Sequence, residues 1–506
     1  VLLVGNLYFL FNNRNHEIEN PISKDNSGDV LDNKTSGDTS SGDVEPSVIV
    51  KDEIKKEPEE EEKTVRAEYD VIVFGAEPEG IVTAISAARN NMKVLLAEKR
   101  DGPGGLLTYA MLNTIDMNFN DDGVLLSQGI FEEFYAKLNN RNSFDVEVAK
   151  NAFKEMLAAE KNIKVMYNVD SYTVGSNGTE VEYAIIDDEK YVAKTYIDCT
   201  QDADITVAAG AEYVIGWEDV NEKNRSMSAT LVIHMDNVDW DKACETIKKE
   251  NRPNTGYSDR GIWAFGNITQ NYIPAQTNMR LKALNIGRQN DGSVLINSLQ
   301  IINADMLDPN SKERAYEKCK EEANYLAKFI KENVPGFENA KLVGVAPELY
   351  VRETRHIIGE YRMTVKDMLE STYYNTAIGL ASYPIDVQTT SIYDYGYIIG
   401  DPNQYYIPMG TIVPKGFKNL LTIGRSGSYT SIAAGSARVI PTGMTLGESA
   451  GIMAAIAKEK DIDFQEMLNN YSVIKDVQNR MKLQGMYLPK ESKPVVDVNG
   501  RYYNYI

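Results

Sequence analysis

An apolar run at residues 69–74 has the length of a buried β-strand, and a glycine-containing turn follows it at residues 75–80. Apolar residues then recur at helical spacing up to residue 90, and residues 93–97 form a second short apolar run. The order strand, glycine turn, helix, strand predicts the first unit of a parallel, Rossmann-like α/β sheet.

The turn at residues 75–80 carries the first candidate chemistry. Gly75 permits a tight turn, and Gly80 permits close packing of the helix on the sheet. The helix that follows aims its amide dipoles at the turn, which favours a bound pyrophosphate. Glu98 ends the second strand, 18 residues beyond Gly80, and is placed to accept a hydrogen bond from a ribose hydroxyl. Together these features predict a dinucleotide site.

Glu77 stands where the usual fingerprint has its middle glycine. A glycine there lets a phosphate approach the backbone, whereas a carboxylate repels a pyrophosphate unless it points away. A second glycine turn, at residues 101–105, follows Glu98 directly. Its Gly104-Gly105 pair lets the backbone pass beside a second phosphate or a flavin, although an ordinary surface loop remains the alternative.

Other patterns extend the fold. Residues 163–197 alternate apolar and polar positions around two turns, which predicts a β-meander. Residues 311–333 place their apolar side chains on one stripe and predict a long helix. A strand at 419–423 precedes a helix rich in small residues that begins near residue 440. Tyrosines crowd residues 373–406 and offer flat faces and hydroxyls either to a sugar or aromatic ligand or to a loop-rich surface.

Composition narrows the function classes. The chain has 506 residues and a net charge of −21, which argues against a nucleic-acid partner because phosphates need a basic face. Its 3 cysteines and 3 histidines are too few for a disulfide framework or a histidine-rich metal centre, so we expect no metal site.

The N-terminal segment, residues 1–66, differs from the rest. Residues 1–11 are mostly apolar but too short to span a bilayer, so they read either as part of a signal or anchor segment or as a mis-started terminus. The polar, acidic residues 12–66 predict a disordered linker. We therefore expect an extracellular or cell-surface protein with a membrane tether at the N-terminus, and a cytoplasmic protein is the alternative.

Three stretches together carry a family resemblance: the turns already described, the segment 196–204 (Tyr-Ile-Asp-Cys-Thr-Gln-Asp-Ala-Asp), and residues 419–444, with Gly424-Arg425 and Arg438-Val-Ile-Pro-Thr442. From about residue 69 to about 458 the chain resembles the FAD-dependent oxidoreductases of the glutathione-reductase-like superfamily, in the branch that includes proteins labelled putative xanthan lyase. In that branch the middle glycine of the first turn is often replaced and followed by proline, as in Glu77-Pro78. Two other positions depart from the family, because Gln201 replaces a glycine and Ser426 replaces a cysteine.

The resemblance implies a Rossmann-like FAD-binding domain at 67–210 and 405–470, with the β-meander inserted, a mixed α+β substrate domain at 211–404, and a C-terminal extension at 471–506. It also implies that FAD is the cofactor and that a helix N-terminus or an arginine stabilises the reduced flavin. The residues that it implies for FAD are Gly75, Pro78, Gly80, Glu98, Lys99, Gly104, Gly105, Leu106, Val169, Thr200, Asp202, Gly424, Arg425, Arg438, Thr442 and Gly443.

Residues 352–361 resemble a block that folds over the flavin in the family, and they supply the catalytic candidates. His356 is the candidate acid or base, because imidazole is the side chain best suited to proton transfer at physiological pH, although the family often has arginine there. Arg355 is placed to orient a substrate oxygen or to pair with Glu353 or Glu360. Tyr361 is a candidate proton donor or a packed core residue.

The resulting hypothesis is an FAD-dependent oxidoreductase that moves a hydride between flavin N5 and a small polar substrate, hydroxylated or carbohydrate, with an unknown electron acceptor. Two alternatives stay open. One is a lyase acting on a polysaccharide. The other is a surface-tethered binding protein that keeps the flavoprotein fold without catalysis, an idea that Glu77 motivates.

Overall fold

The computed structural model describes residues 64–488 and the two short strands β21 (Val495–Val496) and β22 (Tyr502–Tyr503). The expected apolar segment and most of the expected linker therefore lie outside the described residues. Strand β1 begins at Val65, four residues before the apolar run.

The first sheet is the predicted Rossmann-like one. Strands β3, β2, β1, β6 and β20 lie side by side in that order and run parallel, which places their carboxyl ends along one edge. The central strands β1 and β2 consist largely of buried aliphatic residues, as a parallel sheet covered on both faces requires. The bounds of the parallel strands are β1 (Val65–Phe74), β2 (Val94–Ala97), β3 (Ile163–Met166), β6 (Glu189–Asp198) and β20 (Leu420–Thr422).

The predicted β-meander is present on the same sheet. Strands β4 (Tyr172–Ser176) and β5 (Val181–Ile186) pair antiparallel, and β5 pairs antiparallel with the first part of β6. The two turns contain residues in the left-handed region, among them Gly178 and Asp187. The sequence pattern therefore located β4, β5 and β6 correctly. Its first residues, 163–166, instead form β3, which pairs parallel with β2.

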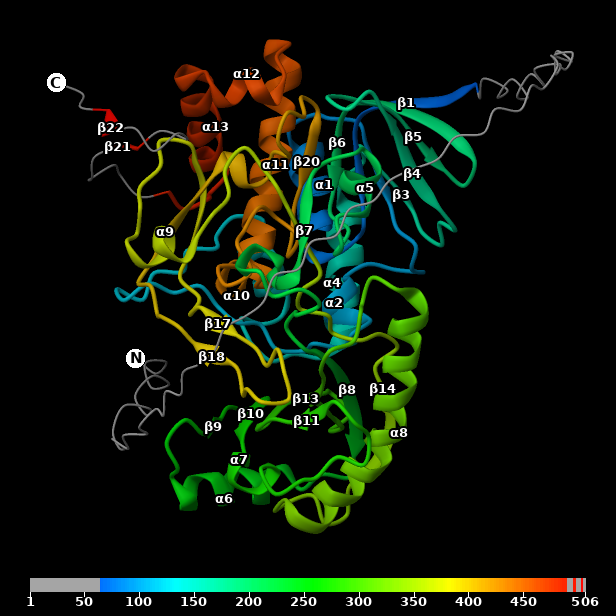
Figure 1. The fold of residues 1–506 in the computed structure, drawn as a ribbon, viewed down its shortest axis with the longest axis vertical. Coiled ribbons are helices and arrows are strands. Elements are labelled where there is room, and N and C mark those ends of the chain that lie inside the picture. Colours follow the sequence, from blue (N-terminus) through cyan, green and yellow to red (C-terminus); the bar gives the residue numbers. More distant parts are fainter. Residues whose placement is uncertain (1–63, 489–494, 497–501, 504–506) are drawn as a thin grey trace, which may run out of the picture. The chain divides into compact units, whose positions relative to one another are not determined.

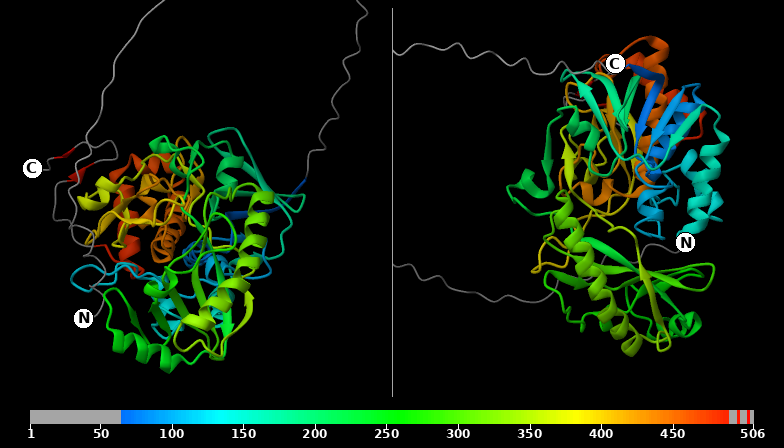
Figure 2. Two further views of the ribbon diagram at one scale, coloured as in Figure 1. Left: turned by 60° about the horizontal axis from the view of Figure 1, so that its bottom comes forward. Right: turned by 90° about the vertical axis from the view of Figure 1, so that its right-hand side faces the viewer.

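A second, antiparallel sheet has its own hydrophobic core. Its strand order is β14-β8-β13-β12-β10-β9, with β11 also paired to β13 (Figures 1 and 2). The predicted long helix is α8, which packs on β14, β8 and β13. Pro309 starts this helix, and Asp308 caps it by accepting a hydrogen bond from the Asn310 N–H. The bounds are β8 (Ala229–Asp236), β9 (Gly256–Tyr257), β10 (Gly261–Ala264), β11 (Met279–Leu281), β12 (Leu284–Arg288), β13 (Val294–Ile301), β14 (Lys341–Val345), α6 (Trp240–Glu250), α7 (Gly266–Thr269) and α8 (Pro309–Asn333).

The remaining elements connect or cover these sheets. Residues 363–413 contribute apolar side chains to the core of the first sheet, not to that of the second. The expected domain boundaries stay predictions. The bounds are α2 (Gly105–Thr108), α3 (Ile130–Lys137), α4 (Val146–Ala159), α5 (Asp204–Ala208), β7 (Tyr213–Ile215), η1 (Gly216–Val220), β15 (Arg355–Ile357), α9 (Val365–Leu369), β16 (Ala377–Ala381), β17 (Asp386–Val387), β18 (Tyr397–Ile398), β19 (Tyr405–Pro408), η2 (Met409–Thr411), α10 (Ala434–Ala437), α12 (Phe464–Leu468) and α13 (Tyr471–Leu483).

Helices α1 (Pro78–Arg89) and α11 (Ile440–Lys460) pack closely against each other beside the first sheet (Figure 1). Glycines of α11 make this approach possible. A Cβ atom on Gly447 would lie 2.5 Å from the carbonyl oxygen of Glu79, and one on Gly451 would lie 2.6 Å from the amide nitrogen of Ala87. The small-residue pattern of α11 therefore marks a helix contact, which brings residues 440–443 beside the first turn.

Among the described residues, none of the helices combines the length and apolar character needed to cross a bilayer.

Glu448 of α11 provides a test of this packing. Its carboxylate is 1% exposed and accepts a hydrogen bond of 2.8 Å from the Ile130 N–H at the start of α3. Burial raises the pKa of Glu448 from 4.5 to about 8. The folded state thus holds a proton that the unfolded chain has released, so stability is lost as pH rises from about 4.5 to about 8.

We expect Glu448→Gln to be more stable than the wild type at pH 9 by at least about 1.4 kcal/mol, the equivalent of one pKa unit, because the glutamine is never charged. The difference should shrink toward zero near pH 4.5. Urea unfolding at both pH values measures it. The exposed Glu132→Gln of α3 is the control and should change stability by less than about 0.5 kcal/mol. A pH-independent difference for Glu448→Gln would contradict the expectation.

Candidate functional site

The three stretches singled out in the sequence meet at the carboxyl edge of the first sheet. The Gly104 N–H donates to the Ala76 carbonyl at 2.8 Å, which joins the two glycine turns. The Cys199 N–H donates to the Phe74 carbonyl at 2.9 Å, and the Ile423 N–H donates to the Asp198 backbone carbonyl at 2.8 Å. The predicted convergence is therefore present in the backbone.

The first turn requires its glycines. Gly75 has φ +91° and lies against β6, where an added Cβ would be 2.8 Å from the Cys199 carbonyl oxygen. An added Cβ on Gly80 would be 2.0 Å from the Gly75 carbonyl oxygen. Pro78 occupies the first position of α1, where its missing N–H costs no hydrogen bond.

Glu77 fills the space between the two glycine turns. Its side chain is 2% exposed. One carboxylate oxygen accepts a hydrogen bond of 2.9 Å from the Leu106 N–H, and the other lies 2.9 Å from Nη1 of Arg100. An added Cβ on Gly105, which has φ +34°, would lie 1.8 Å from the Glu77 carboxylate. The room left by this glycine is thus taken by a side chain of the same protein.

Glu79 fills the next part of the same space. It is 5% exposed, and its carboxylate accepts a hydrogen bond of 2.9 Å from the side-chain amide of Gln201. An added Cβ on Gly424, which has φ +109°, would lie 2.6 Å from this carboxylate. Burial raises the pKa of Glu79, and the nearby Glu77 carboxylate raises it further. Three parts of the chain bound this space: the turn at 75–80, the turn at 104–106, and Gly424. We call it the corridor.

The expected ribose-binding acid is already bonded to the protein. Glu98 is 2% exposed and accepts hydrogen bonds from the Ala76 N–H at 2.6 Å and the Arg100 N–H at 2.8 Å. Burial raises its pKa, opposed by Arg100. Lys99 is exposed and lies over the Tyr172 ring, and the Val169 N–H donates to the Glu98 carbonyl.

The second and third stretches share one polar network. Arg425 donates to Asp202 at 2.5 Å, to Gln201 at 3.1 Å and to the Val351 carbonyl at 2.8 Å. Burial alone would raise the pKa of Asp202, but Arg425 and a hydrogen bond from Thr354 hold it below its usual value. Thr200 bonds within its own strand end, to Asp198. Gln201, an unexpected residue at a glycine position, is thus the link between Glu79 and Arg425.

A second cluster, which the sequence reading missed apart from Arg438, lies at the start of α11. Arg438 donates to the Tyr350 hydroxyl at 2.9 Å and lies 3.8 Å from the Asp386 carboxylate. Arg352 is 6% exposed and stacks over the Tyr350 ring at 4.1 Å. Asp116 and Tyr383 are hydrogen-bonded to each other beside these charges. We call this cluster the polar recess, formed by Asp116, Tyr350, Arg352, Tyr383, Asp386 and Arg438.

The polar recess combines the buried side chains of Tyr350, Arg352 and Arg438 with the exposed side chain of Asp116. Asp116 is solvent-exposed, yet desolvation by the surrounding protein raises its pKa, aided by Asp386 and opposed by Arg438. Burial also lowers the pKa of the neighbouring Lys282. The Nε–H of Arg438 is buried and has no hydrogen-bond partner among the described residues.

The remaining cofactor candidates border this recess. Thr442 is fully buried near the start of α11, and its hydroxyl accepts a hydrogen bond of 2.9 Å from Asn118. The same Asn118 side chain accepts from the Tyr383 N–H. An added Cβ on Gly443 would meet only the Glu79 side chain, at an ordinary 3.6 Å. A sequence signal for the recess existed, because Tyr383 belongs to the tyrosine-rich stretch 373–406.

The three catalytic candidates have partners elsewhere. Arg355 pairs with Asp204 at 2.9 Å and not with Glu353 or Glu360. His356 is 1% exposed and lies 2.9 Å from the Glu353 carboxylate. The Tyr361 hydroxyl bonds to that of Tyr374 at 2.6 Å. Among the described residues, none of the hydrogen bonds of these three side chains joins them to the polar recess, and their catalytic roles stay predictions.

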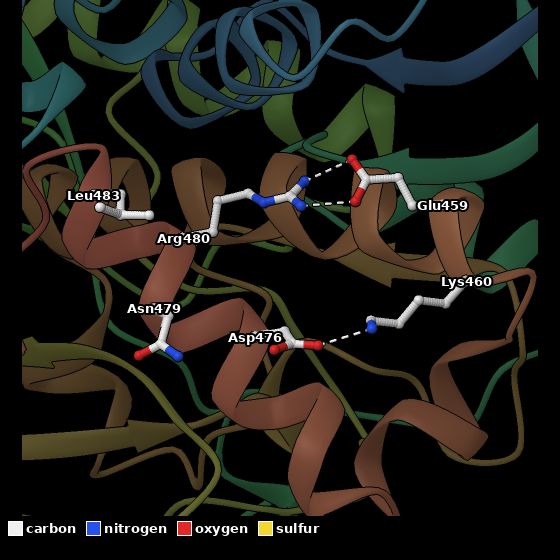
Figure 3. Close-up of a pocket in the computed structure, with 6 residues that line it drawn as sticks. All are labelled: Glu459, Lys460, Asp476, Asn479, Arg480 and Leu483. Atoms are coloured by element: carbon white, nitrogen blue, oxygen red, sulfur yellow. Dashed lines mark hydrogen bonds and ion pairs between the residues drawn. The ribbon is translucent and has the colours of Figure 1, made fainter.

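Two other findings bear on the choice of site. A surface depression between α11 and α13 is lined by paired charges, Arg480 with Glu459 at 2.7 Å and Lys460 with Asp476 at 2.8 Å (Figure 3). These ion pairs leave it without an unpaired charged group for a ligand.

Within residues 64–488, no group of three or more His, Cys, Asp or Glu side chains is arranged to hold a metal ion.

The sequence matches a family model described as FAD dependent oxidoreductase over residues 70–481. The chain therefore belongs to this family of FAD-dependent enzymes, and FAD is the cofactor of an oxidoreductase of this kind. The narrower glutathione-reductase-like branch stays a prediction. None of the curated proteins matches the chain.

Solved structures resemble it only weakly. A geranylgeranyl bacteriochlorophyll reductase-like protein from Thermoplasma acidophilum is 16% identical, covering 83% of this chain and 84% of its own, with a TM-score of 0.40. The p-nitrophenol 4-monooxygenase of Pseudomonas putida is 12% identical, covering 83% and 86%, with a TM-score of 0.38. A myxobacterial chondrochloren halogenase is 11% identical, covering 82% and 79%, with a TM-score of 0.40. These similarities assign neither substrate nor reaction.

The arrangement of side chains in the corridor does not fit the pyrophosphate of FAD. Two buried carboxylates stand where the fold directs a ligand with two negative charges, and one of them takes the backbone donor and the guanidinium that a phosphate would use. Buried like charges repel strongly. The backbone path suits a dinucleotide, whereas the side chains of Glu77, Glu79 and Gln201 take up the space and the donors that a pyrophosphate needs.

Two glycines of the site offer a matched test of its packing. We expect Gly80→Ala to lower the free energy of unfolding by at least about 2 kcal/mol, because its Cβ would overlap the Gly75 carbonyl. Gly443→Ala, also in a helix, should change it by no more than about 1 kcal/mol and in the stabilising direction. Urea unfolding followed by circular dichroism measures both, and equal losses would refute the assignment.

Proposed function

Because the chain belongs to the family of FAD-dependent oxidoreductases, we propose that it oxidises or reduces a small, polar, hydroxylated molecule bound in the polar recess. The observation that carries this proposal is the meeting of two guanidinium groups, two carboxyl groups and two phenols at the start of α11. Hydride transfer with flavin N5 stays a prediction, because the corridor does not fit FAD in this arrangement.

The polar recess supplies donors for such a ligand. Arg438 and Arg352 lie on either side of Tyr350, and the Nε–H of Arg438 needs an acceptor. A buried donor without a partner is costly, so a ligand oxygen that accepts its hydrogen bond gains affinity. The two arginines fit hydroxyl or carboxylate oxygens, and the aromatic rings fit the apolar face of a sugar or other polyol.

Asp116 and Tyr383 are the residues best placed to hold or move a proton. Asp116 is open to solvent and its pKa is raised, which brings the carboxyl closer to neutral pH, where a general base or acid works best. Tyr383 donates to it or accepts from it and keeps the carboxyl oriented. We assign the proton transfer of the oxidation or reduction to this pair.

A second candidate function is a surface-tethered binding protein that keeps the fold and the polar recess. The observation that favours it is the filling of the corridor by Glu77 and Glu79. We propose an extracellular or cell-surface location for either function, on the composition of the N-terminal residues.

The first test is binding. In a thermal-shift screen of hydroxylated carboxylic acids and small sugars, we expect a compound class whose affinity falls roughly tenfold or more, about 1.4 kcal/mol, in Arg438→Ala. The control is Arg480→Ala, an arginine with a surface ion pair on α13. Equal affinity of Arg438→Ala and the wild type would refute the recess as the binding site.

The second test is chemistry, with FAD supplied in excess. Asp116→Asn keeps the size of the side chain but removes its basicity, so we expect the ligand affinity to change little and turnover to fall roughly 100-fold. Bleaching of the flavin absorbance under anaerobic conditions measures the turnover. No bleaching by any ligand of the wild type would favour the binding protein, and unchanged turnover in Asp116→Asn would refute its proton-transfer role.

A further inference from the structure

We propose that Glu77, Glu79 and Gln201 close the corridor from within, so that this chain holds FAD as a weak, exchangeable ligand and not as a tightly bound prosthetic group. The three residues stand at positions where small residues would leave room for the pyrophosphate. The inference is independent of the polar recess and of the proposed substrate.

Glu77 makes the contacts of a bound anion. Its two oxygens receive the Leu106 N–H from the first turn of α2 and the Arg100 guanidinium, each at 2.9 Å. Arg100 also pairs with Glu348 at 2.7 Å and lies 3.4 Å from Glu98, so its positive charge is shared among three carboxylates of the chain. A phosphate that entered would have to displace Glu77 from both donors.

Glu79 and Gln201 close the other end. The Gln201 amide donates to Glu79 and accepts from Arg425, and this chain of bonds spans the corridor from α1 to the end of β20. Glu79 also uses the space beside Gly424, as Glu77 uses the space beside Gly105. Both positions where a missing side chain would admit the cofactor are therefore occupied by a carboxylate.

Glu77 on one side, and Glu79 with Gln201 on the other, are each held by their own hydrogen-bond partners, so moving either group breaks bonds within the protein. Removing Glu77 from its site leaves the Leu106 N–H and Arg100 without that partner, and moving Glu79 breaks its bond to Gln201. Each unit of negative charge that FAD brings beside a buried carboxylate adds repulsion. Entry of FAD thus requires both Glu77 and the Glu79–Gln201 pair to give up partners.

The experiment compares FAD affinity of the full chain and its variants by quenching of flavin fluorescence and by calorimetry. We expect the wild type to purify colourless, and Glu77→Gly combined with Glu79→Ala and Gln201→Gly to bind FAD at least roughly 100-fold more tightly. Glu448→Gln removes a buried carboxylate that contacts Ile130 and is the control, with unchanged affinity. Circular dichroism and thermal melting establish that each variant is folded.

A double variant tests the proposal if the triple variant does not fold. Glu77→Gln with Glu79→Gln keeps the volume and removes both ionisable carboxyl groups. Measured above pH 8, where Glu79 with its pKa of about 8 is ionised as well, it should bind FAD at least roughly tenfold more tightly than the wild type. Wild-type protein that purifies with stoichiometric FAD would overturn the proposal. So would a folded triple variant, or the glutamine pair, with wild-type affinity. These readouts need no substrate, so they are separate from the tests of the polar recess.

Discussion

The close approach of α1 to both its neighbours is the constraint on which the site depends. Gly80 lets the helix start directly on the Gly75 carbonyl, and Gly447 and Gly451 let α11 lie against its other side. Any side chain at these positions would push the elements apart, because the atoms that it would meet belong to the backbone. The turn at 75–80, the end of β6 and the start of α11 are therefore held together by close packing in addition to hydrogen bonds.

Because these elements pack so closely, the carboxylates of Glu77 and Glu79 in the corridor are buried. In an open groove the carboxylates of Glu77 and Glu79 would face water, but here they are 2% and 5% exposed and must find partners in the protein. Arg100 and the Leu106 N–H serve Glu77, and Gln201 serves Glu79. The Leu106 N–H and the Arg100 guanidinium, which could bind a cofactor phosphate, bind Glu77 instead. The backbone thus keeps the path of a dinucleotide site while its donors are used within the protein.

The polar recess differs from the corridor in its origin, because its charged residues come from segments far apart in the chain. Asp116 follows α2, Arg352 follows the second sheet, Asp386 lies in β17, and Arg438 immediately precedes α11. The Arg438 side chain is buried beside the Asp386 carboxylate, at 3.8 Å. Arg352 is buried against the Tyr350 ring and donates to the Ser228 carbonyl and the Thr230 hydroxyl, whereas Asp116 is exposed to solvent. The recess and the corridor lie at the two sides of the same helix start, since Thr442 and Gly443 face one each.

The sequence by itself determined the elements whose signals are local. The apolar run at 69–74, the two glycine turns, the alternating residues 163–197 and the striped helix 311–333 each follow from the spacing of neighbouring residues, and all are present. The sequence also identified Glu77 as a departure from the glycine fingerprint, since the amino-acid type at a position, and so its charge, is known without a structure. Only the tertiary structure decided where that carboxylate points, that Gln201 bonds to Glu79, and that Asp116 and Asp386 meet two arginines. Such contacts join residues tens to hundreds of positions apart, and no local pattern encodes the direction of a side chain across a packed interface.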